Sequence, residues 1–132
     1  MSERLLVVST DCHAGLPISQ YKPYVETKYH DFIDMAVDIQ VDMMDKAEAQ
    51  FLIKEINDAW RAPIKEGLTG AWDYKQRNKM LAGDGIAAEV IFPDGITEQN
   101  TPPFGAGLGL SPKDAVPELQ WAGAMAHNRW LS

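Results

Sequence analysis

The stretch that decides the fold lies near the N-terminus, where residues 7–15 read Val-Val-Ser-Thr-Asp-Cys-His-Ala-Gly. The aliphatic run Leu5–Val8 carries no charge, which is typical of a strand buried on both faces, as parallel strands are. Side chains two apart on a strand share a face, so Asp11 and His13 are expected to point the same way. Gly15 then allows a sharp turn. The stretch predicts a parallel strand, over residues 4–10, with a polar pair at its carboxyl end.

Asp11 and His13 are therefore candidate metal ligands. A carboxylate oxygen and an imidazole nitrogen both bind divalent metals such as zinc. Ligands in open α/β sheets and in barrels also gather at the carboxyl ends of strands. The alternative is a plain turn, with Asp11 in solvent and His13 capping a backbone carbonyl, because such short motifs recur by chance. We therefore expect Asp11 and His13 to bind a divalent metal ion, zinc by preference and manganese as the alternative.

Two further stretches extend this pattern along the chain. Residues 77–93 read Arg-Asn-Lys-Met-Leu-Ala-Gly-Asp-Gly-Ile-Ala-Ala-Glu-Val-Ile-Phe-Pro, and residues 127–131 read His-Asn-Arg-Trp-Leu. With the Asp-x-His-x-Gly of residues 11–15, they resemble the amidohydrolase-related branch (amidohydrolase 2) of the metal-dependent amidohydrolase superfamily. That branch includes aminocarboxymuconate-semialdehyde-decarboxylase-like proteins, and a tyrosine is usual there where this chain has His127. The three stretches stand in family order and bracket nearly the whole chain.

The resemblance implies an α/β fold class. The chain would form the first two βα units of a TIM-barrel-like metal-dependent hydrolase fold. It would be a single domain over residues 1–132, with a long helical insertion at about residues 20–70. A whole barrel of this kind takes about 250 residues, so 132 residues supply an incomplete barrel. The resemblance also implies that Asp11 and His13 are the metal ligands of the first strand.

Arg77 and Asp94 are candidates for substrate contact under this interpretation. Arg77 would reach an anionic substrate if its helix points it at the barrel mouth, and a surface arginine is the alternative. Asp94 follows the second strand at the same face, where a plain turn residue is the alternative. Glu89 interrupts that strand, and a carboxylate in a buried strand must be paired or hydrogen-bonded. We therefore expect Glu89 to contact a lysine or arginine on a neighbouring helix, with a catalytic role as the alternative.

The rest of the chain reads as helices and loops. Residues 14–24 are expected to be loop, and residues 27–60 one long helix or two, with a break near Asp45 or Gln50. The apolar positions of that region recur at helical spacing and are expected to face a core: Phe32, Met35, Ala36, Ile39, Met43, Ala47 and Phe51. Further predictions are a linker at 62–70, a helix capped by Asp73, a strand at 87–92 and a helix starting at Ser111.

Composition excludes several classes of partner. The net charge of −7 argues against nucleic acid and against an anionic membrane surface, since both call for a basic face. No apolar run approaches the roughly 20 residues of a transmembrane helix, and the N-terminus has no signal-peptide pattern. One cysteine allows no internal disulfide, which fits a reducing compartment. We expect a cytoplasmic protein.

Two functions are compatible with these residues. The first is part of a metal-dependent hydrolase or decarboxylase, acting on a small carboxylate or C–N substrate. Two protein ligands fall short of the three expected at a catalytic zinc site, so this chain alone is expected to be inactive. The barrel would be completed in a homo-oligomer or by a partner chain. The second is a non-catalytic module that self-associates through open strand edges and the long acidic helix.

Overall fold

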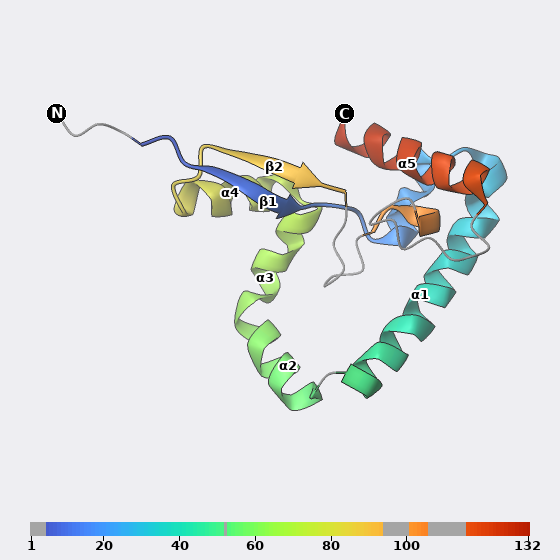
Figure 1. Ribbon diagram of the computed structural model, residues 1–132, viewed down its shortest axis with the longest axis horizontal. Helices are drawn as coiled ribbons and strands as arrows, with labels where there is room; N and C mark the ends of the chain where they lie inside the picture. Colours follow the sequence, from blue (N-terminus) through green and yellow to red (C-terminus); the bar gives the residue numbers. More distant parts are fainter. Residues whose placement is uncertain (1–4, 52, 94–100, 106–115) are drawn as a thin grey trace.

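A computed structural model describes residues 5–51, 53–93, 101–105 and 116–132. The chain is mixed α/β and mostly helical, with one sheet of two parallel strands (Figure 1). The elements follow one another as β1 (Val8–His13), α1 (His30–Phe51), α2 (Lys54–Arg61), α3 (Lys65–Leu68), α4 (Tyr74–Gly83), β2 (Ala88–Phe92) and α5 (Pro117–Leu131). The prediction of an α/β chain with two parallel strands joined by helices is confirmed. The described residues form no barrel.

The first strand lies further along the chain than predicted. Residues 4–10 were the expected strand, whereas β1 begins at Val8 and ends at His13. The reason is the length of its partner: β2 has five residues, and Val8 pairs with Ala88 at its start. Leu5 therefore precedes the pairing and is 87% exposed. The polar residues of the stretch lie inside the strand rather than after it.

Helix α4 leads directly into β2, as the sequence predicts. Asp73 caps its N-terminus, where one side-chain oxygen accepts hydrogen bonds from the backbone N–H groups of Lys75 and Gln76. The helix ends at Gly83, and Gly85 adopts a φ of 71°, a conformation that glycine reaches without strain. In Figure 1, α4 lies behind the two strands and along them. The sheet therefore has a helix on one side.

The hydrophobic core lies beside the sheet and not on it. A 3₁₀-helix at Ile18–Tyr24, the start of α1 and the helix α5 pack together. Tyr21 and Ile33 are fully buried there. The prediction of a loop at 14–24 is confirmed for residues 14–17 and wrong for residues 18–24, whose apolar side chains are held in a helical turn because they cover α1 and α5.

The predicted core face of α1 is only partly correct, since Ala36 packs against the core as expected. Phe32, Met35 and Ile39 were expected to be buried, yet each is exposed by more than 40%. Ile33 is the buried residue instead, because only the first turns of α1 contact the core. The rest of the helix projects away from it (Figure 1). The side chains of Met43, Ala47 and Phe51 lie outside the described residues.

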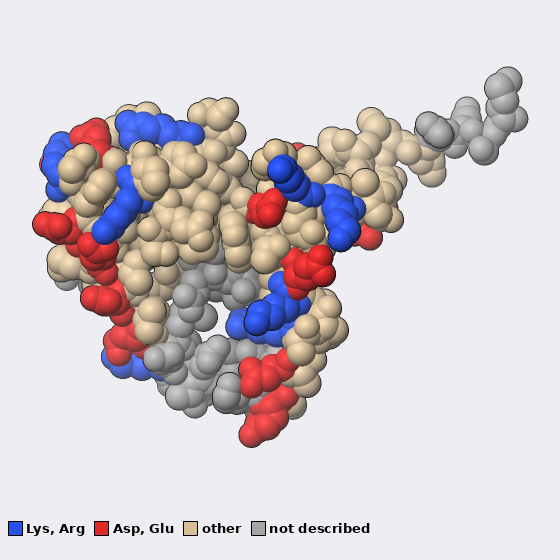
Figure 2. All heavy atoms as spheres, turned by 180° about the vertical axis from the view of Figure 1, so that it is seen from behind, with Lys and Arg blue, Asp and Glu red and all other residues tan. Residues whose placement is uncertain are grey.

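Acidic side chains follow α1 as a solvated face. Asp31, Asp34, Asp38 and Asp42 are all exposed, and Figure 2 shows the acidic side chains in a row along this helix. Lys22 pairs with Asp34 at 2.7 Å, and Lys46 pairs with Asp42 one turn away at 2.6 Å. Such exposed pairs contribute little to stability, about 0–1 kcal/mol each.

The chain turns back after α1 through two short helices. Helix α1 ends at Phe51 and α2 begins at Lys54, close to the second of the two break positions predicted, Asp45 and Gln50. The expected linker at 62–70 is helical instead, with 3₁₀ turns at Ala62–Ile64 and Thr69–Ala71 around α3. Pro63 is accepted because it stands in the first turn of its segment. The helix start predicted at Ser111 lies outside the described residues. No described helix has the length and apolar character needed to cross a membrane.

A buried hydrogen bond between Tyr21 and His127 joins the 3₁₀-helix at Ile18–Tyr24 to α5. The Tyr21 hydroxyl lies 2.8 Å from Nδ1 of His127 and accepts a hydrogen bond from the backbone N–H of Leu16. His127 is 2% exposed. Burial raises the pKa of Tyr21 to about 12 and lowers the pKa of His127. Both groups are therefore held neutral in the folded chain.

This pair gives a pH window for stability. Because the folded pKa of His127 is lowered, its contribution is present above its ordinary pKa of 6.5 and is lost as the pH falls. Because the folded pKa of Tyr21 is raised, its contribution is present below pH 10 and is lost as the pH rises toward about 12. We predict that the free energy of unfolding, measured by urea titration, is greatest between these limits.

The variant Tyr21→Phe should lose about 1–3 kcal/mol of that free energy, because two buried hydrogen-bonding partners are left unsatisfied. Tyr24→Phe is the matched control, since the structure records no hydrogen bond from that hydroxyl to another described residue. Equal midpoints for the two variants would contradict the assignment.

Candidate metal centre

Asp11 and His13 lie side by side near the carboxyl end of β1. Oδ1 of Asp11 is 3.5 Å from Nε2 of His13, and the two side chains are 86% and 43% exposed. The expectation that they share a face is confirmed. Two ligands of one tetrahedral ion, each about 2.0–2.2 Å from it, lie roughly 3.3–3.5 Å apart. The spacing and the donor types of this pair therefore fit two positions around a divalent metal.

The face of the sheet that carries this pair is uncovered. Glu89 points to α4, so Ala88, Val90 and Phe92 lie on the opposite face by alternation. The ring of His13 contacts that of Phe92, with centroids 6.0 Å apart, which places His13 on this face too. Val90 and Phe92 remain 46% and 45% exposed. The pair thus stands at the end of an open apolar surface.

Arg77 connects α4 to both strands. Its Nε and Nη2 atoms donate to the two carboxylate oxygens of Glu89, the second over 2.8 Å. Its Nη1 atom donates to the backbone carbonyl of His13 at 3.0 Å and to that of Gly70 at 3.1 Å. Four of its five N–H donors are committed to these bonds. The expected contact of Glu89 with a basic residue on a neighbouring helix is confirmed.

The electrostatics of this ion pair favour the charged form of Glu89. The side chains of Arg77 and Glu89 are 17% and 12% exposed. The hydrogen bonds from Arg77 lower the pKa of Glu89, and they outweigh the desolvation that would raise it. A bidentate pair of this kind fixes direction as well as distance. It joins the middle of α4 to the second residue of β2.

Cys12 faces the same layer as this ion pair. Its thiol donates to the hydroxyl of Ser9 at 3.0 Å, and Cys12 also contributes to the lowered pKa of Glu89. Ser9 and Cys12 are three residues apart, and they share a face because the register shifts between them. The prediction that Cys12 points away from Asp11 and His13, toward the helical layer, is confirmed.

The structure locates only one of the two residues predicted to contact a substrate. Asp94, a candidate for substrate contact, lies outside the described residues. Arg77, the second such candidate, donates hydrogen bonds to the carboxylate of Glu89 and to the backbone carbonyls of His13 and Gly70. Within the described part of the chain, no third histidine, cysteine, aspartate or glutamate completes a metal-binding group with Asp11 and His13. The hydrogen bonds from Arg77 to the backbone carbonyls of His13 and Gly70 could not be predicted from the sequence, because every residue has a backbone carbonyl.

Comparison with known proteins adds no relative. No protein-family model, no curated protein and no solved structure matches this chain.

The Arg77–Glu89 pair should make stability depend on pH in acid. Because the folded pKa of Glu89 is lowered, its contribution is present above its ordinary value of 4.5 and is lost as the pH falls. Glu89→Gln should cost about 1–3 kcal/mol at pH 7, since Arg77 keeps a weaker, neutral acceptor. It should also flatten the acid side of the unfolding curve.

The control for this variant is Glu66→Gln. Glu66 is 82% exposed and lies 3.6 Å from Lys79 at the surface, so its loss should cost less than about 1 kcal/mol. Urea unfolding at several pH values measures both effects. Parallel pH profiles for Glu89→Gln and the parent would contradict the assignment.

Proposed function

We propose that this chain is part of a metal-dependent hydrolase or decarboxylase of the amidohydrolase kind. Its share of the site is the pair Asp11 and His13. The observation that carries the proposal is their 3.5 Å spacing at the carboxyl end of a parallel strand, on the face opposite α4. In a barrel, this end and this face are where catalytic groups gather.

The chemistry follows from the ligands. When bound, a divalent metal such as zinc supplies Lewis acidity: it lowers the pKa of bound water, or it polarises a substrate carbonyl or carboxylate. Asp11 would bring a negative charge and His13 a neutral imidazole to that ion. The apolar side chains of Val90 and Phe92 beside them would exclude water once covered. A small carboxylate or C–N substrate suits such a site.

The exposed face and edges of the sheet favour a larger assembly in which further strands pack against it. Parallel strands are normally covered on both faces, and here the face opposite α4 exposes Val90 and Phe92. Both outer edges of a two-stranded sheet also leave backbone groups without partners. We therefore place catalysis in an assembly that supplies further strands and a third ligand. Those strands come from the same protein, from a second copy or from a partner chain.

Zinc binding tests this proposal directly. Isothermal titration of the purified chain with zinc should give one site. Asp11→Asn and His13→Ala should each weaken it at least about tenfold, or roughly 1.4 kcal/mol, because each removes one of two protein ligands. His30→Ala is the control, since it removes a histidine that stands at the start of α1.

Two results would overturn the proposal. One is a parent chain that binds no zinc and no manganese. The other is equal affinity in the parent and both ligand variants.

The second candidate function is a self-associating module without catalysis. The observation that favours it is the number of large apolar side chains in solvent. They lie on the sheet and also on α2, where Ile56 and Trp60 are 64% and 58% exposed. Such surfaces on a folded chain mark interaction sites.

Sedimentation velocity can show whether the chain self-associates through the sheet or through α2. If the sheet is the contact, Val90→Lys should convert an oligomer to monomer, because a lysine charge would be buried in the interface. Ile56→Lys on α2 should leave the oligomer intact. Because Val90 is already half exposed, its substitution should not unfold the chain. The reverse pattern would place the contact on the helices, and a monomeric parent chain would exclude self-association.

A further inference from the structure

The carbonyl group of His13 is held by a side chain from another element. Nη1 of Arg77 donates to it over 3.0 Å, from the first half of α4 to the last residue of β1. The same nitrogen donates to the carbonyl of Gly70, just before α4. The guanidinium thus joins the strand end to the segment that precedes its own helix. Such a bond restrains the backbone from which the His13 ring projects.

Further backbone bonds complete the restraint around this residue. The N–H of Ala14 donates to the carbonyl of Phe92 at 3.3 Å, and that of Gly15 donates to Ala71 at 3.0 Å. Gly70 and Ala71 belong to the same 3₁₀ turn. The two peptide groups that follow His13 are therefore both tied, the first to β2 through the N–H of Ala14 and the second to this turn through the N–H of Gly15. Strand ends fray easily, and here the end is fixed.

Glu89 sets the direction of the guanidinium. It accepts from Nε and Nη2 of Arg77, so the planar group can turn only Nη1 toward His13. A lysine at position 77 would keep the charge, but its single nitrogen could not serve Glu89 and two carbonyls in this geometry. The function of Arg77 in this arrangement depends on its fork and not on its charge alone.

The requirement for such support comes from the exposure of the ligand pair. The side chains of Asp11 and His13 are 86% and 43% exposed, so much of their surface faces solvent. Metal sites need their ligands held within about 0.5 Å of the productive geometry. For His13 the ring contact with Phe92 supplies one restraint. The bond from Arg77 to the backbone carbonyl of the residue supplies another.

We propose that Arg77, oriented by Glu89, is a positioning residue for the Asp11–His13 metal site. In this role Arg77 acts through the backbone of His13. It fixes the backbone of His13 so that the imidazole faces Asp11. This inference rests on the proposed metal site. It assigns the buried ion pair of α4 and β2 a part in metal binding as well as in folding.

The test combines zinc affinity with the resonances of the His13 ring. The chain has three histidines, so the ring signals in a ¹H–¹⁵N spectrum can be assigned with His13→Ala. In the parent chain, zinc should shift the His13 signals alone. Arg77→Lys should weaken zinc binding by about 10–100-fold, as loss of groups that orient metal ligands does. Circular dichroism at the assay temperature should show that the variant stays folded.

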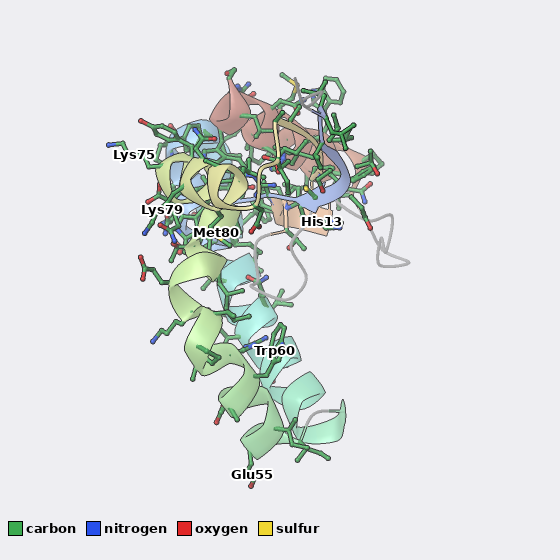
Figure 3. All side chains as sticks on the ribbon, turned by 90° about the vertical axis from the view of Figure 1, so that its left-hand side faces the viewer. His13, Glu55, Trp60, Lys75, Lys79 and Met80 are labelled. Carbon is green, nitrogen blue, oxygen red and sulfur yellow. The ribbon has the colours of Figure 1, made fainter. Side chains whose placement is uncertain are left out.

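The matched control is Lys79→Gln. Lys79 stands on α4 two residues beyond Arg77, and Figure 3 shows it extending from the helix on the side away from His13. This variant should bind zinc as the parent does, although it also removes a positive charge from α4. If Arg77→Lys fails to fold, Glu89→Gln takes its place with the same direction of change, since it weakens the contacts that orient the guanidinium.

The outcomes separate the two proposals. Unshifted His13 signals in the parent chain would overturn the metal site and the positioning role together. Shifted parent signals with equal zinc affinity in a folded Arg77→Lys or Glu89→Gln variant would overturn the positioning role alone. A loss confined to these variants, with Lys79→Gln unchanged, supports it.

Discussion

The guanidinium of Arg77 is the interaction on which the arrangement of the sheet depends. It binds the carboxylate of Glu89 on β2, the carbonyl of His13 on β1 and the carbonyl of Gly70 before α4. A two-stranded parallel sheet is weak by itself, because it has two open edges and few hydrogen bonds. One fork of donors thus holds together three segments that are otherwise separate in the chain. The same fork holds the end of β1, where Asp11 and His13 stand.

The hydrophobic core stabilises a different part of the molecule. Tyr21, Ile33 and Ala126 are buried among the 3₁₀ turn, α1 and α5. The sheet leaves Val90 and Phe92 about half exposed on the face opposite α4. An exposed apolar face of this kind is typical of an interaction surface. This division explains why the chain has a core of its own and an open sheet as well.

The sequence predicted those features that depend on neighbours along the chain. Alternation along β1 placed Asp11 and His13 on one face, the Asp73 side chain predicted the start of α4, and the charge of Glu89 in a strand required a basic partner. The resemblance to the amidohydrolase-related branch is carried by residues 11–15, 77–93 and 127–131 and stays a prediction. The strand positions were less accurate, because β1 begins only where β2 can pair with it.

Other features depend on contacts between distant residues. The spacing of Phe32, Met35 and Ile39 is that of a core face, yet Ile33 is buried because α1 contacts the core only at its start. The bond between Tyr21 and His127 spans 106 residues, and that from Arg77 to the carbonyl of His13 spans 64. Backbone acceptors have no side-chain signature, so no pattern in the sequence could have indicated the second.

The central claim is that Asp11 and His13 bind one ion together. X-ray absorption at the zinc edge of the zinc-loaded chain tests it most directly. We expect one imidazole among the zinc ligands, at about 2.0–2.2 Å from the ion, with oxygen in the remaining positions. The imidazole signal should be lost in His13→Ala. A zinc environment without imidazole, or one that is unchanged in His13→Ala, would contradict the account.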